Sequence, residues 1–288
     1  MKYLNKYRIR RMVLYFCVIA IIFTIILINI PWEDHLAWQL DYDRKRIDVK
    51  TIEPNVIEIT LSELNEENGY TVNQSLMLIN TDYKLDERFE AEIGEYKDTG
   101  ILMNRCMLES YALLSEAVTS NTADNLYVTS TLRTRNEQET LYKDDPETAT
   151  LPDASEHQSG LAADVYAKNF AGEAFLKSNA GQFVNTHCHE YGFIIRYPHY
   201  GKGETKIRFE PWHIRYVGMP HSDIIYNNKL TLEEYIFSLE ENRFYEVGGY
   251  IITRQKPENN MIKIPLNCKN YVISNDNTGC YIVTAEII

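Results

Sequence analysis

The chain has 288 residues, of which 44% are hydrophobic and 12% aromatic, so it can bury a substantial core and does not have the composition of a disordered protein. Its formal net charge is −12, and setting aside the five basic residues among residues 1–30, which include no acidic residue, leaves −17 for the remainder. Such an acidic surface repels phosphate groups, which argues against nucleic acid as a partner.

The N-terminal segment combines a basic stretch with a long apolar run. Five basic residues precede the apolar residues Met12 to Ile30. At about 1.5 Å per residue, a helix of this length spans the roughly 30 Å hydrocarbon core of a bilayer. A cleaved signal peptide is the alternative, but the run is longer than a usual signal core and no small-residue cleavage site follows it. Because basic flanks stay in the cytoplasm, we expect a single-pass transmembrane helix in the cell membrane, with the C-terminal part of the chain outside the cell.

The next segments predict a stalk followed by a globular domain. Residues 31–75 are polar and charged and are interpreted as a partly ordered extracellular stalk with one strand-like run, 56–61, whereas residues 76–80 form a mostly apolar segment that begins the domain. Apolar residues at helical spacing predict helices, and β-branched or alternating residues predict strands. The expected helices cover residues 104–118, 135–142, 181–190 and 230–241, and the expected strands cover 126–132, 161–166, 193–197 and 207–209.

Beyond residue 242 the pattern changes to short strands separated by turns. These strands are expected at residues 250–254, 261–264, 271–274 and 281–288. The predicted fold is therefore α+β: a mixed or antiparallel sheet flanked by helices, with an N-terminal transmembrane helix and a small C-terminal β appendage. The predicted domains are the basic tail and anchor at 1–30, the stalk at 31–75, a globular domain at 76–241 and the appendage at 242–288.

Two short motifs, SEHQSGLAAD and EPWH, contain side chains that can bind a metal. Together His157, Asp164 and His213 offer two nitrogens and one carboxylate, and a catalytic zinc usually takes three such protein ligands. Zinc activates water, and Glu210 is the nearby carboxylate that would accept the proton. A lone buried histidine is more often a hydrogen-bonded core residue. The joint occurrence of all four residue types in two compact motifs favours the metal site.

Sequence spacing requires a turn within each motif. His157 and Asp164 are seven residues apart, and on a continuous strand an odd separation places side chains on opposite faces. Gly160 is where the chain could turn, because glycine tolerates unusual backbone angles. The separation of Glu210 and His213 is also odd, and Pro211 between them favours a turn or bulge.

A second group, His187-Cys188-His189, also has three metal-capable side chains, but these are adjacent in an expected helix. Adjacent helical residues point about 100° apart and cannot jointly bind one ion. We interpret Cys188 as a core residue instead. The remaining histidines considered, His199 and His221, are assigned to the surface or to loops.

The two motifs match the patterns SxHxxGxAxD and ExWH, and they strongly resemble the zinc-dependent D-alanyl-D-alanine carboxypeptidases of the VanY type, in the LAS metallopeptidase group. The segments GFIIRYP and HIRYVG extend the match, so the resemblance covers roughly residues 76–240. It implies that His157, Asp164 and His213 bind Zn²⁺ and that Glu210 is the catalytic base.

The resemblance implies roles for four further residues. Arg133, in the segment STLR at the place of the family's SGYR, would polarise the scissile carbonyl or stabilise the oxyanion. Gln138, Ser155 and Tyr197 match substrate-binding positions. STLR differs from SGYR at its second and third residues, which bears on side-chain selectivity and not on metal binding.

The implied function is a D,D-carboxypeptidase at the outer face of the membrane. It would remove the C-terminal D-Ala from peptidoglycan stem peptides ending in D-Ala-D-Ala, with an implied role in glycopeptide (vancomycin) resistance. Alternatives within the same group are an L,D-carboxypeptidase and a D,D-dipeptidase. A catalytically silent wall-binding protein is the alternative from another class, and the intact Glu210 argues against it. The sequence leaves open the oligomeric state and the role of the C-terminal segment.

Overall fold

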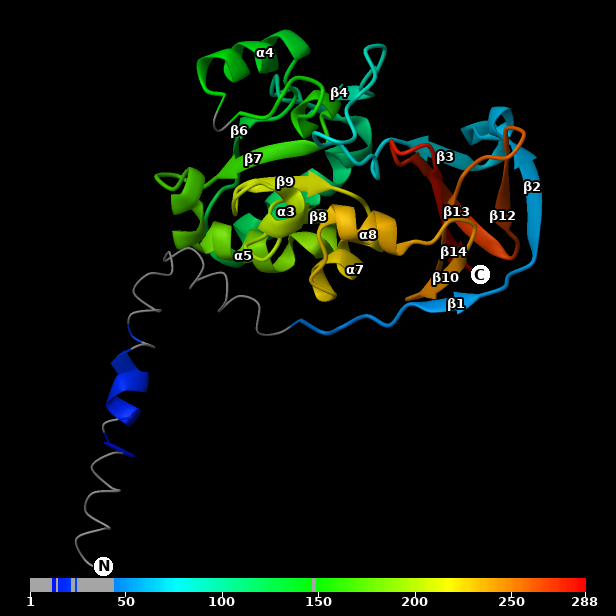
Figure 1. Cartoon of the computed structure of the whole chain (residues 1–288). Helices are drawn as coiled ribbons and strands as arrows, with labels where there is room; N and C mark the ends of the chain where they lie inside the picture. Colours follow the sequence, from blue (N-terminus) through cyan, green and yellow to red (C-terminus); the bar gives the residue numbers. More distant parts are fainter. Residues whose placement is uncertain (1–11, 14, 22–23, 25–43, 147–148) are drawn as a thin grey trace, which may run out of the picture. The chain divides into compact units, whose positions relative to one another are not determined.

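The computed structural model describes residues 12–13, 15–21, 24, 44–146 and 149–288, in a chain that divides into two units, Met1–Tyr42 and Asp43–Ile288 (Figure 1). The described residues of the first unit are helical. Among the described parts of the chain, no helix has both the length and the apolar character needed to span a bilayer. Residues 14, 22–23 and 25–30 of the expected transmembrane helix lie outside the described residues.

A four-stranded antiparallel sheet with the order β6-β7-β9-β8 supports the candidate site. Its strands are β6 (Tyr127–Ser130), β7 (Ala162–Tyr166), β8 (Phe193–Ile195) and β9 (His213–Tyr216). Ala163, Val165 and Ile214 join one hydrophobic core with residues of α3 (Leu108–Thr122) and α5 (Asn179–His187). Because side chains alternate along a strand, Asp164 and His213 are directed to the opposite face.

A second, six-stranded sheet is mixed, because β13 pairs with β3 in parallel and the other neighbours are antiparallel. Its order is β1 (Lys50–Ile52), β10 (Phe244–Val247), β11 (Tyr250–Gln255), β14 (Tyr281–Ile287), β13 (Cys268–Asn275) and β3 (Tyr70–Asn73). Two smaller ladders join β2 (Val56–Thr60) to β12 (Met261–Pro265), and β4 (Ile93–Glu95) to β5 (Leu102–Asn104).

The strands before residue 75 therefore pair with strands after residue 242 (Figure 1). Lys50 of β1 lies opposite Glu246 of β10, and Tyr70 of β3 lies opposite Tyr271 of β13. The segment expected as a stalk and the segment expected as an appendage thus share sheets, although the sequence analysis treats them separately. Local periodicity carries no information about which distant strands pair.

The remaining helices lie in the connections between strands. The α-helices are α4 (Arg135–Asp144), α6 (Lys202–Thr205), α7 (His221–Asn227) and α8 (Leu232–Ser238). The 3₁₀ turns are η1 (Leu61–Glu63), η2 (Glu66–Asn68), η3 (Arg105–Met107), η4 (Glu156–Ser159), η5 (Gly172–Lys177) and η6 (Cys188–Tyr191). The α+β class with mixed and antiparallel sheets is confirmed.

Most of the expected elements occur in the structure with shifted ends. The expected helices correspond to α3, α4, α5 and α8, and the expected strands outside 207–209 correspond to β2, β6, β7, β8, β11, β12, β13 and β14. The strand expected at residues 207–209 is wrong, because these residues pair with no strand. They follow Lys206, whose positive φ of 62° ends α6, and they precede Pro211, which has no N–H to donate to a sheet ladder.

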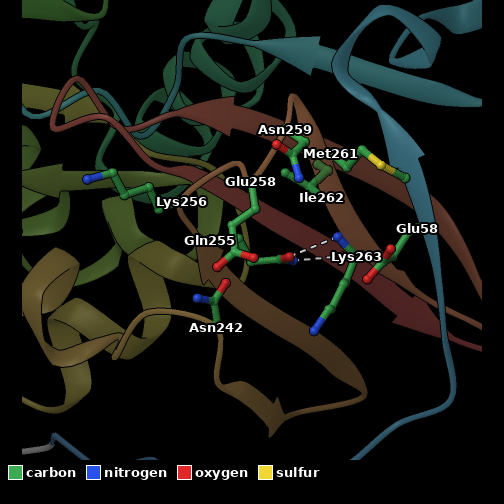
Figure 2. Close-up of a pocket in the computed structure, with 9 residues that line it drawn as sticks. All are labelled: Glu58, Asn242, Gln255, Lys256, Glu258, Asn259, Met261, Ile262 and Lys263. Atoms are coloured by element: carbon green, nitrogen blue, oxygen red, sulfur yellow. Dashed lines mark hydrogen bonds between the residues drawn. The ribbon is translucent and has the colours of Figure 1, made fainter.

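A pocket of about 200 Å³ opens in the C-terminal sheet layer (Figure 2). The Gln255 side chain is fixed there, because its amide donates to the Lys263 carbonyl at 2.7 Å and accepts from the Lys263 N–H at 2.8 Å. The described lining residues are Glu58, Asn242, Gln255, Lys256, Glu258, Asn259, Met261, Ile262 and Lys263. This lining includes no histidine or cysteine, and metal-ligand chemistry of the kind expected from the sequence lies elsewhere.

The surface or loop position expected for His221 is wrong. This residue begins α7 and is buried, with 3% of its surface exposed. Its Nδ1 faces the Tyr235 hydroxyl of α8, and its Nε2 lies 2.9 Å from Thr284 Oγ1 of β14. Both ring nitrogens are therefore satisfied inside the protein, which is what allows a polar ring to be buried there. No local sequence pattern indicates these two distant partners.

Acidification is expected to destabilise the protein through His221. Burial lowers its pKa to about 3 from an ordinary value of 6.5, so between these values the unfolded chain binds the extra proton. The neutral His221 ring has its full stabilising effect above pH 6.5, and this effect is lost as the pH falls toward 3. By pH 5 the loss in the free energy of unfolding is about 2 kcal/mol. Denaturant unfolding at pH 7 and pH 5 measures it. His221→Gln should be less pH-sensitive than wild type over this interval, and an unchanged pH dependence would rule the assignment out.

Candidate metal centre

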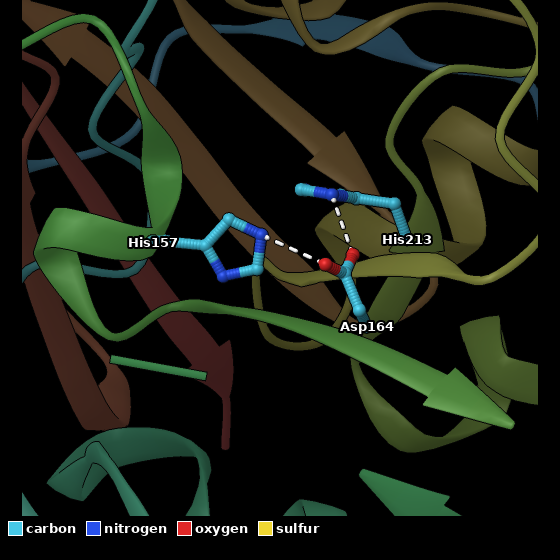
Figure 3. A group of neighbouring side chains, drawn as sticks. All are labelled: His157, Asp164 and His213. Carbon is cyan, nitrogen blue, oxygen red and sulfur yellow. Dashed lines mark ion pairs between the residues drawn. The ribbon is translucent and has the colours of Figure 1, made fainter. Parts of the chain in front are cut away.

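The side chains of His157, Asp164 and His213 point toward one another (Figure 3), and Asp164 and His213 lie on the face of the four-stranded sheet opposite its helical core. One ligand atom from each lies within 4.8 Å of the others. The Asp164 carboxylate lies between the rings, with Oδ2 3.4 Å from His157 Nε2 and Oδ1 3.1 Å from His213 Nδ1. The three side chains expected to form one site from the sequence are therefore adjacent in the structure.

Two local features bring these side chains together. His157 lies in η4, and Gly160 ends that turn with a φ of +68° before β7 begins. A Cβ at Gly160 would lie 2.9 Å from the backbone nitrogen of Asn104, so both the conformation and the space require glycine. Asp164 is the direct partner of His213 in the register of β7 and β9. The expected turn at Gly160 is confirmed.

Each histidine has one nitrogen directed at the site and the other at a separate group. His157 Nδ1 lies 2.7 Å from the Thr131 carbonyl, which can only accept, so Nδ1 carries the proton and Nε2 is left for a metal. His213 Nδ1 faces Asp164, and its Nε2 lies 3.7 Å from Glu156 Oε2.

The electrostatics of the group suit a cation. Burial alone would raise the pKa of Asp164, but hydrogen bonding to His157 and His213 outweighs it and holds this pKa well below its usual range. Burial lowers the pKa of His157. In His213 burial acts in the same direction, but the carboxylates of Asp164, Glu156 and Glu210 prevail and raise its pKa to about 9. At neutral pH the ionised Asp164 carboxylate thus lies between the neutral ring of His157 and the protonated ring of His213, and a metal ion bound at His213 Nδ1 would replace the proton there.

The donor set fits a divalent ion such as zinc. Asp164 Oδ1 is buried, and its contact with His213 Nδ1 is an ion pair without hydrogen-bond geometry, so a metal ion would complete its coordination. Two imidazole nitrogens and one carboxylate oxygen are the ligand types of catalytic zinc sites, which leave a further position for water or substrate.

Glu210 lies beside this group and is partly exposed. Its Oε2 is 3.8 Å from His213 Nδ1, and burial raises the pKa of its carboxyl group. The backbone turns at Pro211 and Trp212, and the N–H of His213 donates to the Glu210 carbonyl at 3.1 Å. This is the expected turn that brings both side chains to one side. A carboxylate with a raised pKa is a better proton acceptor for water.

Arg133 borders a groove of about 640 Å³ that also includes Ser130 and Thr131. Its guanidinium donates to Ser130 Oγ at 2.9 Å and to Gln138 Oε1 at 2.8 Å. Gln138 is buried, and its amide also donates to the Thr150 carbonyl at 2.6 Å. Gln138 therefore contacts Arg133 and helps to hold the Arg133 guanidinium in a fixed orientation.

The other two expected substrate-binding residues are also buried. Tyr197 is 7% exposed, its ring centroid is 4.9 Å from that of His213, and burial raises the pKa of its hydroxyl. Ser155 is 5% exposed and directly precedes η4.

Four buried charged residues behind His213 were missed by the sequence analysis. Glu156 Oε1 accepts from Arg196 Nε at 2.7 Å and from Arg215 Nη1, and Arg196 forms a bidentate pair with Glu233 at 2.6 and 2.9 Å. Burial would raise the pKa of Glu156, but the two arginines outweigh it and hold the pKa well below its usual range. A signal was present, since Arg215 stands two residues after His213 and shares its face of a strand.

The side chains of His187, Cys188 and His189 go to separate partners. The His187 ring stacks on Phe183, and His189 Nδ1 lies 2.6 Å from Asp223 Oδ1. Cys188 is 1% exposed within the core between α3 and α5, and burial raises its pKa to about 12. The interpretation of Cys188 as a core residue is confirmed.

Comparison with known proteins identifies related sequences and structures. Residues 100–219 match the family model described as VanY, D-alanyl-D-alanine carboxypeptidase. A D-alanyl-D-alanine carboxypeptidase of Enterococcus faecium is 31% identical over 244 residues, which is 77% of each chain. All three candidate ligands and Glu210 fall inside the matched range.

Two solved structures have a similar fold. The vancomycin resistance D,D-dipeptidase VanXYg, in complex with a D-Ala-D-Ala phosphinate analogue, gives a TM-score of 0.62 at 27% identity and covers 82% of this chain and 100% of its own. The LD-carboxypeptidase LdcB gives a TM-score of 0.51 at 29% identity and covers 56% of this chain and 84% of its own.

Proposed function

Because the chain belongs to the VanY family of D-alanyl-D-alanine carboxypeptidases, which are zinc metallopeptidases, we propose that it removes the terminal D-Ala from peptidoglycan stem peptides ending in D-Ala-D-Ala. The observation that carries this proposal is the group of His157, Asp164 and His213, within 4.8 Å of one another, with Glu210 beside it.

The proposed mechanism divides the work among a few side chains. His157, Asp164 and His213 would hold zinc, which would supply Lewis acidity to the site. Glu210 accepts a proton from the attacking water and passes it to the departing D-Ala nitrogen. Arg133, held by Ser130 and Gln138, stabilises the negative charge that develops on the carbonyl oxygen.

The rival specificities come from the same group of enzymes. VanXYg is described as a D,D-dipeptidase and LdcB as an LD-carboxypeptidase, and both share this fold. We favour a D,D-carboxypeptidase because the Enterococcus faecium relative of that activity matches 77% of both chains.

Turnover of three substrates side by side separates these activities. The zinc-loaded chain is expected to release D-Ala from a stem pentapeptide with the highest kcat/KM, and to act poorly on the tetrapeptide and on free D-Ala-D-Ala. A chelator should abolish the release of D-Ala and added zinc should restore it. Preference for the tetrapeptide would identify an L,D-carboxypeptidase, and preference for the dipeptide a D,D-dipeptidase. Failure to cleave any of them, with binding to cell wall intact, would indicate a silent binding protein.

We also propose that residues 12–30 anchor the chain in the cell membrane and that residues 31–288 lie outside the cell. The basic residues before this apolar run support that orientation. Removing the terminal D-Ala from stem peptides would remove the target of vancomycin, which connects the activity to glycopeptide resistance. Protease added to intact cells should digest the chain beyond Ile30. Complete protection of that part would contradict the proposed topology.

A further inference from the structure

The Glu156 carboxylate is buried directly behind the candidate metal centre. It is 1% exposed and belongs to η4, one residue before His157. Its two oxygens have different surroundings. Oε1 accepts hydrogen bonds from Arg196 and Arg215, whereas Oε2 is directed at His213.

The oxygen directed at His213 is the unusual one. Glu156 Oε2 lies 3.7 Å from His213 Nε2, and neither atom has a hydrogen-bond partner in the described part of the chain. A buried carboxylate oxygen without a donor is costly, and so is a buried ring nitrogen without a partner. A proton on His213 Nε2, directed at Glu156 Oε2, would satisfy both atoms at once after an approach of about half an ångström, which brings the 3.7 Å separation into hydrogen-bond range.

The same proton decides which nitrogen of His213 faces the ion. A neutral imidazole carries one proton, so a proton at Nε2 leaves the lone pair on Nδ1. Nδ1 is the nitrogen that lies 3.1 Å from Asp164 Oδ1 and belongs to the metal-capable group. His157 has the reverse arrangement, with Nδ1 at the Thr131 carbonyl and Nε2 toward the site. The two histidines therefore need different tautomers, and each needs its own acceptor.

We propose that Glu156 is a positioning residue for His213, with Oε2 accepting the Nε2 proton so that Nδ1 is presented to the metal. The inference rests on the proposed zinc site and adds to it the group that selects the tautomer of one ligand. Histidine ligands commonly donate their second N–H to a carboxylate, and loss of that partner typically lowers metal affinity by about 10–100-fold.

Two arginines keep the carboxylate from turning away. The Arg215 guanidinium donates hydrogen bonds to Glu156 Oε1, to the Ser75 carbonyl at 3.1 Å and to the Met77 carbonyl at 2.7 Å. Arg196 spans Glu156 and Glu233 of α8. Each guanidinium group also donates hydrogen bonds to acceptors other than Glu156, so its position is fixed. Glu156 Oε1 is therefore held in place, and Oε2 stays directed at His213.

The competing interpretation is that Glu156 only neutralises the buried arginines. Glu233 offers a matched control, because it is also a carboxylate paired with Arg196 but no contact joins it to His213 among the described residues. Glu156→Gln and Glu233→Gln each remove one negative charge from the same network. Both are expected to lower stability. In Glu156→Gln the two arginine donors hold the amide oxygen, so an NH2 group, which cannot accept, faces His213 Nε2, whereas Glu233→Gln leaves that position unchanged.

The test measures the zinc dissociation constant of the full-length chain by competition with a chromophoric chelator. Glu156→Gln is expected to weaken zinc binding by about 10–100-fold and to change the visible absorption spectrum of the Co²⁺-substituted protein, while Glu233→Gln stays close to wild type in both. Should Glu156→Gln not fold, Glu156→Asp keeps the charge and withdraws the carboxylate from His213 by one methylene group, and it is also expected to weaken binding.

His213→Ala makes the two possible failures distinguishable. If His213→Ala keeps wild-type zinc affinity, the proposed metal site itself is wrong. If His213→Ala loses zinc while the Glu156 variants bind it as tightly as wild type, only the positioning role is overturned. Equal losses in Glu156→Gln and Glu233→Gln would also overturn it, because the network would then act through stability alone.

Discussion

Glu210→Gln is expected to lower turnover of the stem pentapeptide by at least about a hundredfold, because proton transfer by a positioned side chain contributes about 10²–10⁴-fold. The amide keeps the size of the side chain and removes its basicity. Zinc content and substrate binding should stay near normal, so the loss should appear in kcat. Single-turnover and steady-state kinetics on the purified, zinc-loaded variant measure it.

A matched control for this variant is Glu204→Gln, which makes the same chemical change at an exposed position of α6. It is expected to retain wild-type turnover. Glu210→Gln cleaving the pentapeptide at close to the wild-type rate would mean that the assigned base is wrong, even with the zinc site correct.

His157→Ala is expected to lose the metal and the activity together. The substitution removes one of three protein ligands, and a site with two remaining donors no longer has the usual ligand set of catalytic zinc. Metal analysis after dialysis and turnover of the pentapeptide measure the two losses on the same sample. The expected zinc content falls from one ion per chain toward zero.

His187→Ala is the corresponding control, since that ring stacks on Phe183 and lies outside the candidate group. It should keep both zinc and turnover. Full zinc occupancy in His157→Ala would exclude His157 as an essential ligand.

The candidate ligands were predictable because the chemistry imposes residue types within short motifs. His157 and Asp164 are close in sequence, and glycine at position 160 signals the turn that joins them. His213 could be placed with them only through the pairing of β7 and β9, which the motif spacing does not contain. The elements with clear periodicity, such as α3 and β7, were predictable for the same local reason.

Interactions between distant residues were not predictable from local patterns. The pairing of β1 with β10 and the burial of His221 against Tyr235 and Thr284 depend on contacts that only the folded chain creates. The ion pairs of Glu156 with Arg196 and Arg215 also join distant residues, although the place of Arg215 two residues after His213 is a local sign that Arg215 lies near the site. A charged residue in a strand is ordinarily predicted to face solvent. Its burial becomes favourable only when an oppositely charged side chain lies beside it in the folded protein.

Anomalous diffraction at the zinc absorption edge, from crystals of the zinc-loaded protein, tests the central claim most directly. We predict a single zinc ion bound by His157 Nε2, the Asp164 carboxylate and His213 Nδ1, each at about 2.0–2.2 Å. A strong zinc peak at another place, such as beside His189 and Asp223, with none among these three residues, would contradict it.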